Sequence, residues 1–485
     1  MVDFNNLTIK KAHEGLKDKS FSALELTEEL FKVAANSESV LHAHLVLMHD
    51  EAIKNAKKTD DRIAKGNMLG SLDGIPLSIK DNMNLKGYGT TCSSKILSNY
   101  VSPYDATVVK RLRENGTIFV GKTNLDEFAM GSSTENSAYG PTRNPWDPEC
   151  VPGGSSGGSA AVVSVGSALG SLGSDTGGSI RQPASFCGVV GFKPTYGTVS
   201  RFGLIAFASS LDQIGPFTKT SEDAKIIYEA ISGHDLKDAT SLNLQPTSLP
   251  EGSSAKIGIV KELMGEGISD EVKGEVERVV KILESEGHLV SEVSLPMTKM
   301  AISIYYLIAP AECSANLARF DGVRFGLRRD GSSSYKMSDK TRADGFGDEV
   351  KRRILLGTYA LSAGYYDAYY GHALKARNKV INEFKEVFTD VDYLISPTTP
   401  STAFKFGEKT SNPLEMYMSD LCTIPANLAG LPAISIPTGV NAEGMPFSVQ
   451  LMSPELTDIS LLNFSSYLEK LIGFQEVPSR WRKEP

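Results

Sequence analysis

The sequence predicts an α/β protein, and three observations support this class. Segments with the periodicity of helices alternate with segments that have the periodicity of strands. Apolar residues make up 41% and charged residues 22% of the 485 residues, which is typical of a globular protein with a sizeable core. The alternation also continues to the end of the chain. Together these observations favour a single domain with insertions, spanning 1–485, over a row of separate domains.

Residues 1–65 are expected to form a helical segment. Ser22 and Glu25 have the spacing of a helix capping box. The residues around them that lie along one helical face are Leu24, Thr27, Leu30, Phe31 and Ala34. Such a helix would pack on the main body of the protein or on a partner.

Strands and helices then alternate. Apolar and polar residues alternate with the period of a strand over 72–81, and a second strand is expected over 117–120. Helices are expected over 106–115 and over 159–169, where the second would pack closely through small residues. The order of these elements is the main support for the α/β class.

An insertion is expected over 250–390, after a connection at 246–252. It begins with a strand, a helix and a second strand, expected over 256–260, 272–283 and 289–293. A mostly helical run, 300–388, follows. The chain then returns to the core with strands over 393–396, 433–436 and 447–452.

Charge and cysteine content exclude several classes. The formal net charge is −8, the wrong sign for a protein that binds nucleic acid unaided. The five cysteines are odd in number and form no Cys-x-x-Cys pair, so we expect neither a disulfide framework nor a metal site. They are expected to be small buried residues in a reducing cytoplasm.

Neither a secretory signal nor a membrane span is expected. Residues 1–16 contain no apolar stretch behind a basic start. The longest run of small and apolar residues, 160–172, falls short of the roughly 18–20 residues that span a membrane. The basic segment 324–353 is interleaved with Asp and Ser, and we expect a solvated loop there rather than an RNA contact.

Two glycine- and serine-rich blocks stand close together, at 152–160 and 173–181. A flexible linker is a weak interpretation, because apolar segments bracket both blocks. Glycines in such turns allow positive φ, and consecutive N–H groups can form a nest that binds an anion. With Ser179 opening a helix, the helix N-terminus would add positive potential where an oxyanion develops. The blocks therefore predict a site that attacks a carbonyl group.

The proton carrier of this site needs a separate explanation, because no histidine lies in either block. All seven histidines lie outside the motifs, although a Ser-His-Asp triad assembled by the fold remains an alternative. Lysine can replace histidine when burial lowers its pKa by about 3–5 units from about 10.4. Lys80 ends an apolar strand and is the candidate, although taken alone it is typical of an exposed strand end.

Three motifs together resemble the amidase signature family. They are Gly74-Ile75-Pro76 with Lys80-Asp81-Asn82, Gly153-Gly154-Ser155-Ser156-Gly157-Gly158-Ser159, and Asp175-Thr176-Gly177-Gly178-Ser179-Ile180-Arg181. The resemblance implies a large mixed β-sheet covered by helices on both faces. It also implies a triad of Ser179 as nucleophile, Ser155 as bridging serine behind a non-proline cis peptide bond, and Lys80 as general base. The implied oxyanion hole is the backbone of Thr176, Gly177, Gly178 and Ser179.

Longer segments resemble those family members that hydrolyse glutamine within a tRNA-dependent amidotransferase; these are 121–136, 143–146, 347–370 and 416–430. A pocket for free glutamine needs an arginine for the α-carboxylate and an aspartate for the α-ammonium group. The resemblance assigns these roles to Arg353 and Asp420, although by sequence alone Arg353 could equally be a surface residue. The further substrate-binding residues that it implies are Met130, Gly131 and Tyr305, or the neighbouring Tyr306.

The resemblance also implies two other subunits in a heterotrimer. A kinase/transamidase subunit would bind most of the tRNA and use ATP, Mg²⁺ and the released ammonia to amidate Glu-tRNA(Gln), with Asp-tRNA(Asn) as a further candidate. A small third subunit would hold the pair together. No cofactor is expected in this chain, and it contains no Gly-x-x-x-x-Gly-Lys-Ser/Thr loop for ATP.

Two other functions remain as alternatives. The first is a stand-alone hydrolase of small or aryl amides, which would share the triad and work without partners. The second is a catalytically silent scaffold, against which the complete set of Lys80, Ser155 and Ser179 argues. The pair of Arg353 and Asp420 favours the glutamine-hydrolysing function over the stand-alone amidase.

Overall fold

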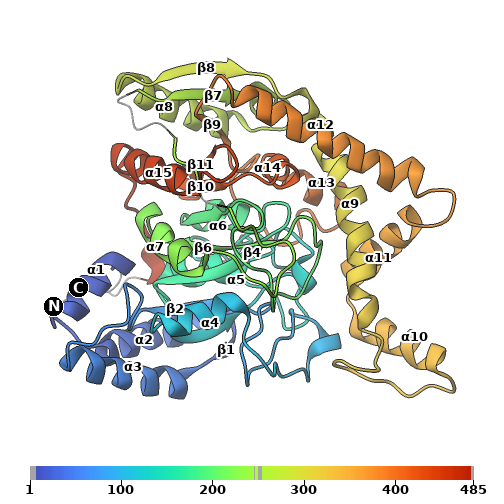
Figure 1. Ribbon diagram of the computed structural model, residues 1–485, viewed down its shortest axis with the longest axis horizontal. Coiled ribbons are helices and arrows are strands. Elements are labelled where there is room, and N and C mark those ends of the chain that lie inside the picture. The colour runs from blue at the N-terminus through green and yellow to red at the C-terminus, as the bar shows by residue number, and fades with distance from the viewer. Residues whose placement is uncertain (1–6, 245, 250–253, 482–485) are drawn as a thin grey trace.

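An 11-stranded mixed sheet runs through the protein, in the order β1-β3-β2-β4-β6-β5-β10-β11-β9-β7-β8. The structure, a computed structural model, describes residues 7–244, 246–249 and 254–481 (Figure 1). The strands are β1 His44–Leu47, β2 Pro76–Lys80, β3 Ile118–Thr123, β4 Gly170–Asp175, β5 Val190–Lys193, β6 Gln213–Thr218, β7 Lys256–Val260, β8 Leu289–Val293, β9 Tyr393–Pro397, β10 Ala433–Val440 and β11 Pro446–Met452. The sheet is mixed because β2 runs parallel to β3 and β4 while β4 runs antiparallel to β6.

Helices cover both faces of this sheet, which confirms the predicted class. They are α1 Ile9–Lys17, α2 Ala23–Leu41, α3 His49–Ala64, α4 Thr107–Glu114, α5 Gly157–Val165, α6 Arg181–Cys187, α7 Ser221–Ile231, α8 Asp270–Ser285, α9 Ala301–Asn316, α10 Ser334–Gly345, α11 Asp348–Ala360, α12 His372–Val387, α13 Pro413–Met418, α14 Ile424–Ala429 and α15 Asp458–Ile472. Among the helices of the described residues, none is long and apolar enough to cross a membrane.

The N-terminal helices form as the sequence predicts. Ser22 Oγ accepts the backbone N–H of Glu25 at 3.0 Å, and the Glu25 carboxylate accepts the N–H of Ser22 at 2.8 Å. This capping box begins α2, whose buried face includes Leu30 and Ala34. Figure 1 shows α1, α2 and α3 together beside the end of the sheet that contains β1.

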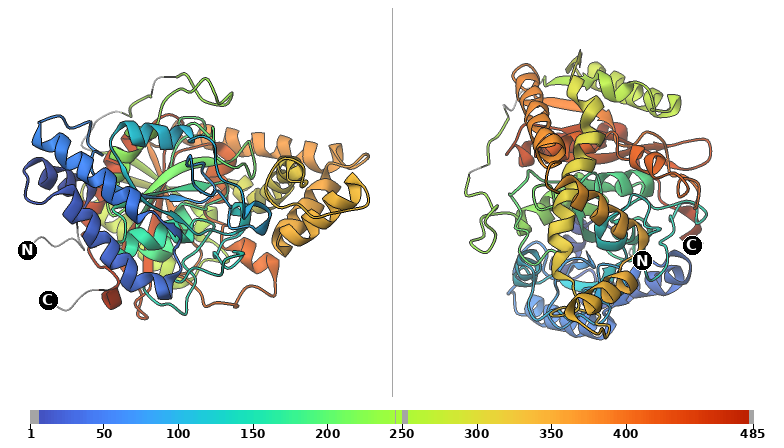
Figure 2. Two further views of the ribbon diagram at one scale, coloured as in Figure 1. Left: turned by 90° about the horizontal axis from the view of Figure 1, so that it is seen from below. Right: turned by 90° about the vertical axis from the view of Figure 1, so that its right-hand side faces the viewer.

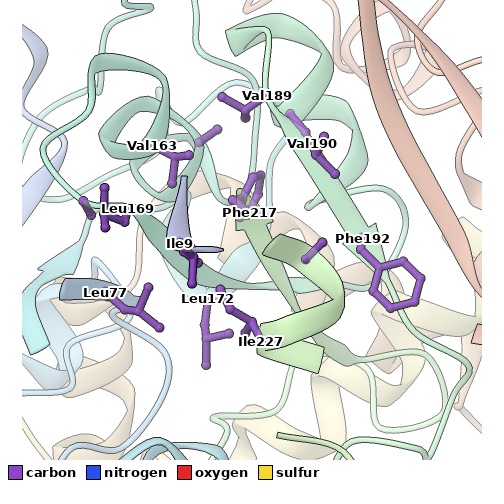
Figure 3. Close-up of a cluster of buried hydrophobic side chains, with 14 of the residues drawn as sticks. Ile9, Leu77, Val163, Leu169, Leu172, Val189, Val190, Phe192, Phe217 and Ile227 are labelled. Carbon is purple, nitrogen blue, oxygen red and sulfur yellow. The ribbon is translucent and has the colours of Figure 1, made fainter. Parts of the chain in front are cut away.

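The central strands are buried on both faces, which gives the polar residues of 72–81 a different meaning. Every residue of β2 is buried, because β2 lies between β3 and β4. Its apolar side chains join a core in which Figure 3 shows Leu77, Leu172 and Phe217 close to Ile227 of α7. Its polar side chains enter buried polar clusters, and Ser78 Oγ lies 3.0 Å from His44 Nε2.

The segment 250–390 adds strands to the same sheet and a set of helices beside it. Strands β7 and β8 run parallel and are joined through α8, as the βαβ pattern predicts, and β7 also pairs with β9. Helices α9 to α12 project from one side of the sheet in both views (Figures 1 and 2). The expected connection at 246–252 falls partly outside the described residues.

Two local expectations were wrong. The segment 324–353 is not a loop throughout, since it contains α10 and the start of α11. Ser333 caps α10 by accepting the N–H of Lys336, and the basic residues that suggested a loop lie mostly on solvent-exposed positions. The helix expected over 159–169 is α5, which begins two residues earlier and ends at Val165, because Gly166 takes a left-handed conformation.

Candidate active site

Lys80, the last residue of β2, ends inside a cluster of serine hydroxyl groups. Its Nζ lies 2.9 Å from Ser155 Oγ, 2.7 Å from Ser156 Oγ and 3.0 Å from Ser174 Oγ. The side chain is completely buried, because β3 and β4 flank the strand and α5 begins directly beside it. Lys80 is therefore not an exposed residue at a strand end.

Burial lowers the pKa of Lys80 to about 7, because the ammonium group loses its hydration inside the protein. The carboxylates of Asp126, Asp175 and Asp212 oppose this shift by favouring the charged form. A large fraction of Lys80 is therefore neutral near pH 7, and a neutral amine can accept a proton from a hydroxyl group. Among the described residues, no histidine is hydrogen-bonded to Ser155 or to Ser179.

Ser155 stands just before α5, and the Gly154–Ser155 peptide bond is cis. The N–H of Gly154 donates to Gln182 Oε1 at 2.8 Å, and the carbonyl oxygen of Ser155 accepts the N–H of Asp126 at 3.1 Å. A Cβ atom on Gly154 would lie 2.1 Å from a carboxylate oxygen of Asp126, so only glycine fits there. The backbone on both sides of this peptide bond is thus held by neighbouring elements.

Ser179 lies in the turn between β4 and α6, two residues before the helix begins, and 8% of it is exposed. Gly178 has a φ of +137°, and a Cβ there would lie 2.1 Å from Thr423 Oγ1. A Cβ on Gly177 would lie 2.8 Å from the ring of Tyr305. Within the described residues, the N–H groups of Gly177 and Ser179 have no hydrogen-bond acceptor, so they can donate to an oxyanion.

The carboxylate of Asp175 holds this turn from its buried side. It accepts the N–H of Gly178 at 2.8 Å and that of Ile180 at 3.1 Å. Arg181 binds both carboxylate oxygens, through Nε and Nη2, at 3.1 Å each. Burial alone would raise the pKa of Asp175, but Arg181 lowers it to about 2. The N–H of Gly178, which the family resemblance counts in the oxyanion hole, is therefore engaged by a carboxylate.

Arg353 is buried on α11, with only 3% of its surface exposed. Its Nε donates to Glu349 Oε1 at 2.8 Å, and its guanidinium carbon lies 5.3 Å from the ring centre of Tyr306 and 5.5 Å from that of Tyr417. Its two terminal nitrogens have no hydrogen-bond partner in the part of the chain that the structure describes. A buried guanidinium with unpaired N–H groups is suited to bind an anion.

Asp420 is buried close to the same turn as Ser179. Thr423 Oγ1 donates to the carbonyl oxygen of Gly177 at 2.7 Å and approaches that of Asp420 at 3.1 Å. Ser132 Oγ donates to the Asp420 carboxylate at 2.6 Å. Burial raises the pKa of Asp420 to about 7, although Ser132 and Arg353 oppose the shift. A cation bound beside Asp420 would keep it ionised.

Met130 and Gly131 begin the loop that carries Ser132. Met130 is buried with its Sδ 3.7 Å from Cys313 Sγ, and a Cβ on Gly131 would lie 2.3 Å from the carboxyl carbon of Asp126. This loop joins the surroundings of Ser155 to those of Asp420. In the described part of the chain, no group of three or more His, Cys, Asp or Glu side chains could hold a metal ion.

Sequence reasoning missed several residues of the site. Ser156 and Ser174 both contact Lys80, and Asp126 and Glu349 hold the residues expected to react or bind. Ser156 was within a quoted block, but nothing in the sequence shows which of its hydroxyl groups reaches Lys80. For Glu349 the signal was present, because Glu349 and Arg353 have the i,i+4 spacing of a helical ion pair.

Residues 25–462 match the family model described as Amidase. The chain belongs to the amidase family. Members of this family with high similarity include the A subunit of glutamyl-tRNA(Gln) amidotransferase from Carboxydothermus hydrogenoformans. It is 54% identical over 476 residues, which cover 97% of this chain and 98% of that protein. The protein of the same name from Gloeothece citriformis is 54% identical over 456 residues, covering 93% and 94%.

Solved amidase structures agree with this membership. The structure of the A subunit of glutamyl-tRNA(Gln) amidotransferase from Thermotoga maritima is 44% identical, covers 97% of this chain and 96% of its own, and gives a TM-score of 0.79. The peptide amidase from Stenotrophomonas maltophilia gives a TM-score of 0.84 at 26% identity, covering 98% of this chain and 99% of its own. The amidase fold is therefore shared by relatives whose names state different substrates.

Proposed function

We propose that this protein is the glutaminase component of a tRNA-dependent amidotransferase. The observation that carries the proposal is the pair of buried charges beside the Ser179 turn, namely Arg353 with unpaired terminal nitrogens and Asp420. Free glutamine carries an α-carboxylate and an α-ammonium group in addition to its side-chain amide. A pocket with one buried cation and one buried carboxylate matches both groups.

Lys80 is the general base of the proposed reaction. In its neutral form it accepts a proton from Ser155, and Ser155 takes the proton of Ser179, whose oxygen attacks the side-chain amide of glutamine. The Ser179 hydroxyl makes no hydrogen bond to other described residues, so its contact with Ser155 forms as substrate binds. The C–N bond then breaks, the proton returns along the same path to the leaving nitrogen, and ammonia departs.

The oxyanion of the tetrahedral intermediate is held by backbone N–H groups of the 176–179 turn. Those of Gly177 and Ser179 have no other acceptor in the described chain, whereas that of Gly178 is shared with Asp175. Thr176 is fixed through its hydroxyl, which donates to Asp212 at 2.7 Å. The resulting γ-glutamyl ester on Ser179 is hydrolysed by water that Lys80 deprotonates through Ser155, which regenerates the free serine.

Glutamine is oriented by the two buried charges. Arg353 binds its α-carboxylate and Asp420 its α-ammonium group, and the ring of Tyr305 closes the pocket over Gly177. Met130 and Gly131 lie in the loop that positions Ser132 against Asp420. The site uses no cofactor of its own.

The ammonia passes to the kinase/transamidase partner, which converts Glu-tRNA(Gln) to Gln-tRNA(Gln) with ATP and Mg²⁺ and binds most of the tRNA. A small third protein holds the two together in a heterotrimer. Support comes from the names of relatives that match over nearly the full chain. A role in tRNA charging implies a location in the cytoplasm.

The test is a glutamine-hydrolysis assay on the chain alone and on the complex assembled with its partners, with Ser179→Ala as the inactive reference. Ammonia release from glutamine that depends on Ser179 supports the proposal. Hydrolysis of simple and aryl amides without hydrolysis of glutamine, with or without partners, would instead establish the stand-alone amidase. No hydrolysis of any amide would leave only the scaffold.

A further inference from the structure

We infer that Glu349 is a specificity-determining positioning residue: it fixes the Arg353 side chain so that the terminal guanidinium nitrogens face an α-carboxylate. The inference rests on the proposed function, because it assigns a role within the same glutamine pocket. Nothing in the chemistry of hydrolysis requires Glu349. Its effect is on which amides the site prefers.

The Glu349 carboxylate is held from three directions. Oε1 accepts the Nε–H of Arg353 at 2.8 Å and the hydroxyl group of Tyr417 at 3.1 Å, and Oε2 is bonded to Arg352. The Glu349 side chain is 11% exposed, so the bond to Arg353 is shielded from water. The bond to Arg352 is exposed and adds little.

The direction of the Arg353 guanidinium depends on this one bond. The rings of Tyr306, Tyr417 and Phe207 lie around its central carbon at 5.3, 5.5 and 5.6 Å. Cation–π attraction holds the charge near the rings but does not fix the fork of N–H groups within its plane. The Nε–H to Glu349 bond does fix it, because the guanidinium is planar and its donors are rigidly spaced.

The remaining donors of Arg353 are left for a ligand. Nε is used by Glu349, and the four N–H bonds of the two terminal nitrogens have no acceptor in the described residues. A buried guanidinium in that state is costly unless an anion completes its hydrogen bonds. A carboxylate bound by two parallel N–H groups would do so, and the α-carboxylate of glutamine has that geometry.

The start of α11 gives Glu349 a fixed position. Glu127, itself buried, accepts the N–H of Gly347 at 2.8 Å at the beginning of the helix. A Cβ on Gly347 would lie 2.3 Å from a carboxylate oxygen of Glu127, so the two segments are in close contact. Glu349 therefore stands in the first turn of a helix that is anchored beside the pocket, and α11 transmits no slack to Arg353.

The experiment compares two substrates in the assembled complex, glutamine and 4-aminobutanamide, which is glutamine without its α-carboxylate. In Glu349→Gln we expect KM for glutamine to rise about tenfold with kcat within about twofold, because a mispositioned donor loses roughly one charge-assisted hydrogen bond. The kcat/KM for 4-aminobutanamide should stay unchanged. Glu275→Gln, the same substitution in the Glu275–Arg278 pair of α8, serves as the matched control and should match wild type on both substrates.

Tyr417→Phe provides a second, milder variant that keeps the ring and removes only the hydroxyl donor to Glu349. We expect a rise of about two- to threefold in KM for glutamine alone. Unchanged kinetics of Glu349→Gln on glutamine, or an equal loss on both substrates, would overturn the inference while wild-type glutaminase activity leaves the proposed function intact. Wild-type hydrolysis of 4-aminobutanamide without hydrolysis of glutamine would overturn both.

Discussion

Asp175 accepts the backbone N–H of Gly178 at 2.8 Å, and this bond gives the nucleophile turn its shape. The same carboxylate accepts the N–H of Ile180, so every second amide of 178–180 points toward Asp175. The amide of Ser179 between them is thereby left to point elsewhere. A buried ion pair with Arg181 keeps Asp175 charged for this role. One carboxylate thus orders the backbone around the reacting serine without touching a substrate.

Replacing Asp175 by asparagine should therefore cost both stability and activity. The change leaves Arg181 buried without its counter-ion, and we expect the free energy of unfolding to fall by about 3–5 kcal/mol, measured by urea denaturation. The matched control is Asp344→Asn, which removes the exposed ion pair with Arg329 and should cost less than about 1 kcal/mol. Equal losses in the two variants would mean that the buried pair does not stabilise the fold.

The glutaminase activity should require pH values above about 7. Lys80 must be neutral to act as a base and Asp420 must be charged to bind an ammonium group, and the pKa of each is about 7. Both active forms are lost as pH falls, so log(kcat/KM) for glutamine should decline with a slope of about 2 below pH 7. In Asp420→Asn only Lys80 titrates, and the slope should be about 1.

Initial rates at low glutamine concentration on both sides of pH 7 decide this point. Lys80→Arg is the companion variant, because arginine keeps its proton throughout and should abolish turnover at every pH. A slope that stays near 2 in Asp420→Asn would remove Asp420 from the ammonium site. Residual activity in Lys80→Arg would return attention to a histidine base.

Gly178→Ala should disable the oxyanion hole. A Cβ at this position would lie 2.1 Å from Thr423 Oγ1, and the φ of +137° is unfavourable for alanine. Displacing the turn misaligns its N–H groups, so we expect kcat to fall by about 100-fold or more, measured at saturating glutamine. Gly444→Ala, which also has positive φ but no atom within 4 Å, should leave kcat unchanged.

The triad could be expected from the sequence because its chemistry demanded a base and no histidine stood near the serines. Placing that base in contact with Ser174 could not be expected, since the contact joins residues 94 positions apart. It exists because β2 pairs with β4, a strand order that local patterns do not encode. The close approach of Asp126 to Gly154 has the same origin.

The segment 324–353 failed for a different reason. Its basic and polar residues suggested a solvated loop, yet α10 needs only a narrow buried face, which Met337 and Thr341 provide. The fate of Arg353 was also undetermined by sequence, because Lys351, Arg352 and Arg353 are adjacent cations. Helical geometry decides it, since three successive residues of a helix point in different directions and one of them faces the core.

Asp126 should set the pH range in which Lys80 works. Besides holding Ser155 through its N–H, Asp126 contributes the largest opposing charge effect on Lys80, ahead of Asp175 and Asp212, with Cys92 as the remaining titratable neighbour. Removing its charge in Asp126→Asn lowers the pKa of Lys80 further, so the acid limb of kcat should move to lower pH by about half a unit or more. Glu135→Gln, in the loop beside it, should leave that limb in place. A uniform loss of kcat at every pH, with the midpoint unmoved, would restrict Asp126 to holding the backbone, because a purely structural defect does not change the proton affinity of the base.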